Sequence, residues 1–128
     1  MKYELTSESK TIDSVILYRI RALKDFDGVT RGDLGGWIES EKNLSQSGSC
    51  WISGNARISG NAWISGNAKV SGNAKVYGNA WIYGNAKISD YAKVSGNAWI
   101  YGNAWISCNA RISGNAKVSG NAKVYGNA

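Results

Sequence analysis

A period of six residues runs without a slip from Ile52 to Val124 and constrains the fold more than any other feature of the chain. In a repeat such as "NAKVSG", an aliphatic residue lies two positions after a small one, and Gly-Asn follows in most repeats. Side chains alternate between the two sides of a strand, so Ala and Val point one way while Lys and Ser point the other. Gly and Asn tolerate the left-handed backbone of a sharp corner. The aliphatic positions are Ile52, Ile58, Ile64, Val70, Val76, Ile82, Ile88, Val94, Ile100, Ile106, Ile112, Val118 and Val124.

Short strands and corners repeated by sixes predict an all-β fold, a triangular parallel β-helix of hexapeptide repeats. Three repeats of six make one coil of 18 residues, and the Val, Ile and Ala side chains fill the interior. Successive coils stack at the spacing of neighbouring strands, roughly 4.8 Å. A heptad helix is excluded, because Gly and Asn at every sixth position would destabilise it strongly.

The coil length sorts the outward-pointing residues into three faces, because residues 18 apart lie above one another. The first face mixes Trp and Lys, the second is basic throughout, and the third is mainly aromatic. The first face holds Trp51, Lys69, Lys87, Trp105 and Lys123. The second face, called here the cationic ladder, holds Arg57, Lys75, Lys93 and Arg111. The third face holds Trp63, Trp81 and Trp99, then Lys117; the three Trp residues with the neighbouring Tyr83 and Tyr101 are called here the aromatic strip.

The aromatic strip has three interpretations. Stacked rings stabilise successive coils as cross-strand pairs do. A contiguous apolar strip on a protein surface also marks an interface, and another copy of this chain is the partner we expect. The third interpretation is a platform for a ligand. We predict that the strip is a homo-oligomer interface.

The cationic ladder has two interpretations. It is a solvated face that keeps columns from associating side by side, or it is a site for an anion such as a nucleic acid, a nucleotide or an anionic surface. Trp51 and Trp105 among the lysines of the first face suit stacking of bases.

One corner departs from the repeat in two adjacent coils. It reads "SDYA" before Ala92 and "SCNA" before Ala110, which places Asp90, Tyr91 and Cys108 together. This is sequence drift or the one local polar site on the column. Asp90 lies near Lys87 and Lys93, and we expect it to pair with them. Cys50 occupies an inward position and lies too many coils from Cys108 for a disulfide.

The first 45 residues lack the period and differ in charge. Residues 1–45 carry a net charge of −1 and residues 46–128 a net charge of +7, so the expected boundary follows residue 45. "KYELT" and "TIDSVILYRIRAL" predict two strands joined by the turn "SESK". Trp37-Ile38 echoes the repeat and Leu44 follows six residues after Ile38, which predicts an irregular first coil under a small N-terminal β cap.

Several function classes are excluded or disfavoured by what the sequence contains. The polar N-terminus and the short apolar runs predict neither a signal peptide nor a membrane span, so the expected location is the cytoplasm. The chain has no His, and Asp90 is the only acid in residues 46–128. There is no phosphate-binding loop and no set of Cys and His with the spacing of a metal site. We therefore expect no catalytic residues, no metal and no cofactor.

The stretch "DFDGVTRGDLGGWIESEKNLSQSGSCWISGNA" resembles hexapeptide-repeat proteins of bacteriophages, prophages and enterobacteria, labelled as transferases or polymer-forming proteins. The resemblance covers residues 17–56 and implies a β-helix, most often left-handed in such families, and a phage or prophage source. Hexapeptide acyltransferases use a His base, and β-helical carbonic anhydrases bind zinc through three His. This chain has no His, so we expect neither the acyltransferase nor the carbonic anhydrase activity.

Two hypotheses of function follow. The first is a non-enzymatic, self-associating scaffold or interaction module of phage or prophage origin. The second is a phage protein that captures an anionic small molecule, for example a nucleotide signal of host defence; a host protein or nucleic acid are further possible partners. A relative of hexapeptide acyltransferases is a distant third.

The last repeats, "NAKVYGNA", keep the full register up to Ala128. If the chain is complete there, an uncovered end presents unpaired backbone groups and an open core. We then expect tail-to-tail contact between two columns through Val118 and Val124, because the irregular N-terminal segment blocks head-to-tail growth.

Overall fold

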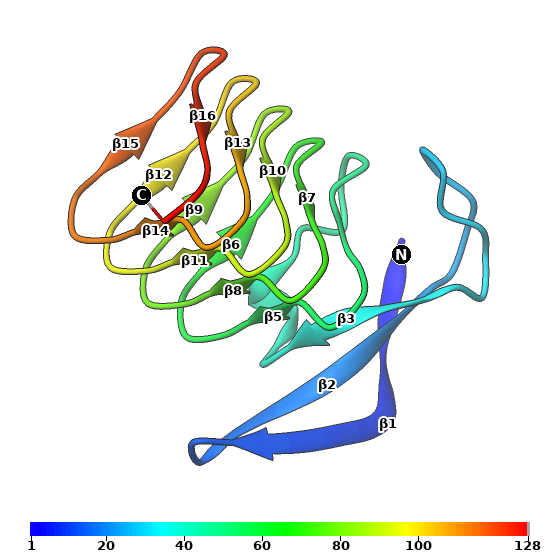
Figure 1. The fold of residues 1–128 in the computed structure, drawn as a ribbon. Helices are drawn as coiled ribbons and strands as arrows, with labels where there is room; N and C mark the ends of the chain where they lie inside the picture. The colour runs from blue at the N-terminus through cyan, green and yellow to red at the C-terminus, as the bar shows by residue number, and fades with distance from the viewer. Residues whose placement is uncertain (128) are drawn as a thin grey trace.

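The computed structural model describes residues 1–127, and its repeats form a parallel β-solenoid (Figure 1). Two-residue strands in three sheets surround one core, in the orders β5-β8-β11-β14, β4-β7-β10-β13-β16 and β6-β9-β12-β15. The bounds are β4 Trp51–Ile52, β5 Arg57–Ile58, β6 Trp63–Ile64, β7 Lys69–Val70, β8 Lys75–Val76, β9 Trp81–Ile82, β10 Lys87–Ile88, β11 Lys93–Val94, β12 Trp99–Ile100, β13 Trp105–Ile106, β14 Arg111–Ile112, β15 Lys117–Val118 and β16 Lys123–Val124. The predicted β-helix is confirmed, while its handedness and triangular section remain predictions.

The interior is built as the six-residue period predicts. From Ala56 to Ala110 each Ala is fully buried, and so is each aliphatic residue from Ile52 to Ile106. From Trp51 to Trp105 each outward residue of the repeats donates its N–H to the Ala carbonyl of the next coil, for example Lys75 N to Ala92 O at 2.9 Å. The backbone is thereby satisfied between coils, as a column of parallel strands requires.

The corners carry two devices that the repeat encodes. Gly78 has φ +71, and a Cβ there would lie 2.9 Å from the Gly96 nitrogen, so only Gly fits this corner. Asn side chains form ladders in which Nδ2 of one coil donates to Oδ1 of the next at 3.2–3.4 Å. The two continuous ladders are Asn61-Asn79-Asn97-Asn115 and Asn67-Asn85-Asn103-Asn121.

A long hairpin precedes the solenoid, and its turn is not where the sequence placed it. β1 (Tyr3–Ile12) and β2 (Val15–Ala22) pair in antiparallel fashion around Asp13 and Ser14. Both turn residues have positive φ, 52° and 69°, as a tight two-residue hairpin requires. The predicted turn "SESK" was wrong, because these residues belong to strand β1. The pairing with β2 continues past them after a register shift between Leu5 and Ser9. They are polar because β1 is a solvent-exposed edge strand.

The first coil is irregular, as predicted. β3 (Leu34–Ile38) pairs with β2 in antiparallel fashion and with β5 in parallel, so hairpin and solenoid share one sheet. Ile38 pairs with Ile58 and Leu44 with Ile64, 20 residues apart, whereas Ile52 pairs with Val70 at the regular 18. The composition change after residue 45 therefore falls inside this coil.

The first coil also contains the 3-10 helix η1 (Glu41–Asn43). Asn43 is fully buried. Its Nδ2 donates to Gly60 O at 3.2 Å and to Ala62 O at 2.8 Å. This side chain ties the irregular coil to the regular coil above it, and it leaves no buried amide donor unpaired.

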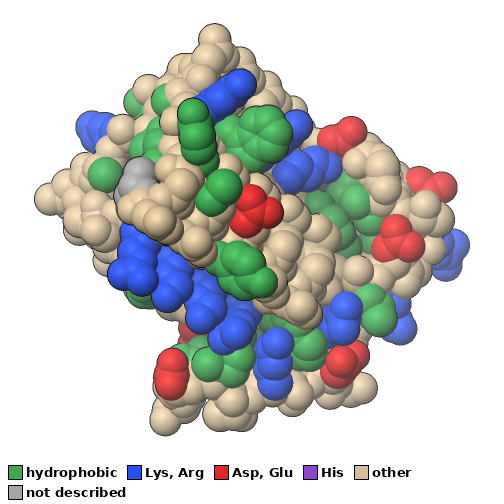
Figure 2. All heavy atoms as spheres, in the orientation of Figure 1, with side chains coloured by type: hydrophobic (Ala, Val, Ile, Leu, Met, Phe, Trp, Pro, Cys, Tyr) green, Lys and Arg blue, Asp and Glu red, His purple; other side chains and the backbone are tan. Residues whose placement is uncertain are grey.

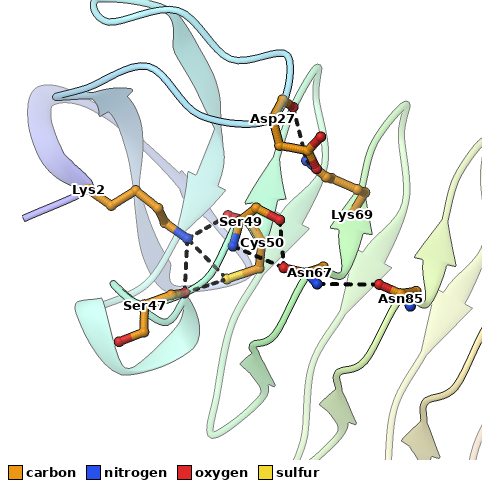
Figure 3. A network of polar contacts seen from close by, with 8 residues as sticks. All are labelled: Lys2, Asp27, Ser47, Ser49, Cys50, Asn67, Lys69 and Asn85. Atoms are coloured by element: carbon orange, nitrogen blue, oxygen red, sulfur yellow. Dashed lines mark hydrogen bonds and ion pairs between the residues drawn. The ribbon is translucent and has the colours of Figure 1, made fainter.

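The N-terminus seals the open end of the core through polar contacts (Figure 3). Lys2 is fully buried, and its Nζ donates to Cys50 O at 2.7 Å. The Tyr3 hydroxyl donates to Leu44 O at 2.6 Å. Asp27 forms an ion pair with Lys69 at 2.9 Å, which fastens the loop between β2 and β3 to the first face. The pKa of the Asp27 carboxyl is lowered, chiefly by its hydrogen bond to Lys69.

Across residues 1–127 no helix has the length and apolar character needed to cross a membrane.

Candidate functional site

The cationic ladder is confirmed as a column of stacked side chains. Arg57 pairs with Lys75, Lys75 with Lys93, and Lys93 with Arg111, each directly above the last. Figure 2 shows the ladder as a diagonal row of blue side chains along the lower left edge of the solenoid. The ion pairs of residues 1–127 are Arg19–Glu8, Arg21–Glu4 and Lys69–Asp27, so none of them involves the ladder.

A groove of about 740 Å³ runs along the cationic ladder. One wall is the ladder, and the other is a corner column that precedes the same strands. The corner column consists of Asn73, Tyr91, Asn109 and Asn127. The groove lining contains no carboxylate. The sequence placed the cations correctly, but it gave no reason to group them with these corner residues.

Tyr91 interrupts the Asn ladder of the corner column. Asn55 Nδ2 donates to Asn73 Oδ1 at 3.3 Å, and among residues 1–127 no side-chain amide bond continues beyond Asn73. Tyr91 is the aromatic residue of the groove lining, and it is 61% exposed. Asn73 and Asn109 line the groove one coil to either side of it. The 18-residue spacing of Asn73, Tyr91 and Asn109 is the sequence signal that would have found this arrangement.

Asp90 and Cys108 meet at this corner as expected, but Asp90 is not paired with Lys87 or Lys93. Its carboxylate accepts a hydrogen bond from the Cys108 backbone N–H at 3.0 Å. Both residues occupy positions that Gly fills elsewhere, and both have φ 58°. Asp is among the residues that tolerate this backbone region best, because its short side chain can bond locally. The predicted lysine pairing is therefore corrected: the carboxylate caps the backbone instead.

A second hollow, of about 360 Å³, lies on the opposite side of the ladder under the tip of the hairpin. Ile12, Val15 and Leu17 of the hairpin line it together with Tyr77, which is 42% exposed. Asp13 at the turn is its one acidic residue. The ladder is therefore flanked by a polar groove on one side and a more apolar hollow on the other.

The aromatic strip is confirmed as a stack on the third face. Trp63 and Trp81 meet edge to face at 5.8 Å, and Trp81 and Trp99 stack at 5.6 Å with an interplanar angle of 7°. Tyr83 and Tyr101 stack at 5.1 Å. The three Trp side chains nevertheless remain 44%, 42% and 38% exposed. Coil stacking is therefore real, and it leaves much of the apolar surface in water.

The first face differs from the expectation of a stacking surface. Trp51 is buried, because Phe26 of the β2–β3 loop packs on it edge to face at 5.4 Å. It cannot stack on a base, and only Trp105, 45% exposed, is available there. A groove of about 670 Å³ along this face includes Asp27, whose ion pair with Lys69 reduces its positive charge.

The remaining candidate residues have structural positions. Cys50 is buried and Cys108 exposed, and both are free thiols. Val118 and Val124 are half-buried in the last coil described. In the part of the chain that the structure describes, no group of three His, Cys, Asp or Glu side chains is placed to hold a metal ion.

Fold and faces together define a parallel β-solenoid with a cationic groove and an aromatic strip. The family model described as YdcK beta solenoid repeat matches residues 52–66, 68–84 and 110–126. An Escherichia coli (strain K12) protein named "Uncharacterized acetyltransferase YdcK" is 41% identical over 59 residues, which cover 40% of this chain and 18% of that relative. The chain thus spans 18% of the relative's length. The resemblance to hexapeptide-repeat proteins is confirmed at the level of the repeat fold.

Proposed function

We propose that the chain is a non-enzymatic interaction module that self-associates through the aromatic strip. The observation that carries this proposal is the exposure of Trp63, Trp81 and Trp99, 38–44% after they have stacked on one another. The surface of the strip also has a hollow of about 230 Å³, which lies between Trp63, Trp81 and Tyr83. Exposed apolar surface of this kind is stabilised by burial against a partner.

A second copy is the partner that fits the strip best. It presents the same column of aromatic side chains, so the exposed apolar surface of one copy would be covered by the exposed apolar surface of the other. Contact about a twofold axis uses the same patch on both copies and closes as a dimer. The cationic ladder lies on a different face, so this contact does not bring the two ladders together.

The absence of His from the sequence supports the non-enzymatic part of the proposal. The E. coli relative is named an uncharacterized acetyltransferase, but this chain spans 18% of it. General acid–base catalysis of acyl transfer needs a side chain with a suitable pKa, most often His. Release of CoA from acetyl-CoA by the purified protein would contradict this part. A phage or prophage source and a cytoplasmic location complete the proposal.

Light scattering after size exclusion tests the interface. Replacing Trp63, Trp81 and Trp99 with Ser should halve the particle mass, because the apolar area that drives association is removed. Trp105→Ser is the matched control, since Trp105 is equally exposed on another face, and it should leave the mass unchanged. A wild-type monomer, or a triple variant of unchanged mass, would refute self-association through the strip.

A further inference from the structure

The cationic ladder is unusual because its charges are stacked and uncompensated. Like charges directly opposite one another on neighbouring strands destabilise a sheet. Here Lys75 has a cation immediately above and below it, Lys93 and Arg57. No acid of residues 1–127 pairs with these three side chains. An extended polyanion would relieve the repulsion along the whole column at once, whereas a single small anion would relieve it in one place.

The opposite wall of the groove adds groups that a simple charge patch lacks. Asn73 carries amide N–H donors, and Tyr91 removes the Asn acceptor that the ladder would place above them. Asn109 lines the groove on the other side of Tyr91. Amide donors bind phosphate oxygens well. Tyr91 lies between Asn73 and Asn109 and is 61% exposed. A flat ring next to a row of cations is the arrangement that binds a base and its phosphates.

Neither Asp90 nor Asp13 lines the groove. Asp90 precedes Tyr91, but its carboxylate accepts the Cys108 N–H and does not line the groove. Asp13 lies across the ladder, in the hollow under the hairpin tip. The electrostatic field inside the groove is therefore set by Arg57, Lys75, Lys93 and Arg111.

We propose that this groove binds single-stranded nucleic acid, with phosphates along the cationic ladder and one base stacked on Tyr91. The strand must be single because a base in a duplex cannot reach the ring without leaving its stack. Binding of this kind tolerates many sequences, since every base has a face that stacks on an aromatic ring. The site lies on a different face from the aromatic strip, and it goes beyond the proposed self-association.

Fluorescence anisotropy with a labelled oligothymidylate of about 12 nucleotides tests the proposal, a length within the site sizes of roughly 4–16 nucleotides known for single-strand binders. Each phosphate contact contributes about −0.7 to the slope of log affinity against log salt. Three or four contacts predict a slope of about −2 to −3. Lys75→Gln with Lys93→Gln should reduce the magnitude of that slope by about 1.4.

Tyr91→Ala is the decisive variant, because it removes the ring without rebuilding the amide bond that an Asn at this corner would offer to Asn73. It should fold normally, lower the affinity for the oligothymidylate about 5-fold or more, and leave the salt slope unchanged. Tyr91→Phe keeps the ring and should bind like the wild type. Inorganic polyphosphate has no bases, so Tyr91→Ala should leave its affinity unchanged.

Lys87→Gln with Lys123→Gln is the matched charge control, because both lysines are exposed on the first face. This pair should retain the wild-type affinity and slope. Three results would overturn the proposal: no binding at low salt, equal loss in the control pair, or an oligothymidylate affinity that is indifferent to Tyr91→Ala. The last result, with binding retained, would identify a general polyanion surface instead.

Discussion

The Lys2 ammonium nitrogen lies 3.2 Å from the Cys50 sulfur, inside the sealed N-terminal end of the solenoid. It also donates to Cys50 O at 2.7 Å and to Ser47 O at 3.4 Å (Figure 3). Lys2 is fully buried, and this burial lowers the pKa of its ammonium below the ordinary value. A charged group held there by carbonyl oxygens makes the stability of the cap depend on pH.

We expect the free energy of unfolding to rise as the pH increases from the lowered pKa of Lys2 towards the ordinary Lys value of about 10.4. The unfolded chain holds the Lys2 proton more tightly than the folded chain, so raising the pH through the lowered pKa favours folding. Lys2→Met should remove most of the slope in urea titrations across this range. Lys10 should account for a smaller pH dependence that remains in this variant, because burial against Trp37 also lowers the pKa of its ammonium. Equal slopes in both proteins would show that Lys2 is not the source.

The pH range of that experiment is limited by Tyr3. Burial raises the pKa of the Tyr3 hydroxyl, so the unfolded chain loses this proton first as the pH increases. Stability is therefore lost above the ordinary Tyr value of about 10, opposite to the effect of Lys2.

Tyr3→Phe should lower the free energy of unfolding by about 1–3 kcal/mol. The hydroxyl donates to Leu44 O at 2.6 Å, with Glu41 O at 3.2 Å as a second acceptor for the same proton. Phe leaves Leu44 O without that donor. Tyr125→Phe, at a position 65% exposed, is the control and should change stability by less than about 0.5 kcal/mol. Comparable losses in both variants would contradict the structural role of the buried hydroxyl.

Gly36→Ala should loosen the first coil. A Cβ at Gly36 would lie 2.5 Å from Ile52 Cγ2 and 2.7 Å from Ala56 O, and the second of these is backbone that cannot move away. We expect a cost of about 1–3 kcal/mol, as for other overpacked cores. Hydrogen exchange should accelerate at the Trp37 amide, which bonds Ala56 O, while the Lys93 amide in a distant coil stays protected. Unchanged protection at Trp37 would show that β3 accommodates the methyl group.

Cys108→Gly should stabilise the solenoid by about 1 kcal/mol. Cys108 has φ 58°, a region that costs little for Gly and more for other residues. Asp90→Gly is the paired comparison, because Asp90 has the same φ and also accepts the Cys108 N–H. Its lost hydrogen bond should offset the relieved strain, giving a change near zero in urea unfolding. A larger gain for Asp90→Gly than for Cys108→Gly would contradict the capping role of the carboxylate.

Much of the candidate site was predictable by counting. Arg57, Lys75, Lys93 and Arg111 were assigned to one face because they are 18 residues apart, and the structure pairs them in that order. Tyr91 was recognised as a departure from the repeat, but its place in the wall of the groove was not. The corner geometry decides how close the column of corner residues lies to the cationic ladder, and the six-residue period does not specify that geometry.

The hairpin shows where local pattern misleads. "SESK" has the composition of a turn, yet it lies within an edge strand, whereas Asp13-Ser14 forms the turn. Polar residues suit both settings, and strand pairing decides between them.

The sequence by itself determined the solenoid, its buried Ala and aliphatic columns and the composition of its three faces. Alternation along a strand and a fixed coil length are local properties, so each repeat carries them independently. Only the tertiary structure decided that Phe26 covers Trp51, that Lys2 is sealed beside Cys50, and that the cationic ladder forms one wall of a groove. The contacts of Phe26 with Trp51 and of Lys2 with Cys50 join segments that are far apart in the chain and share no period. The free energy of these contacts therefore depends on how the non-repeating N-terminus folds back onto the column.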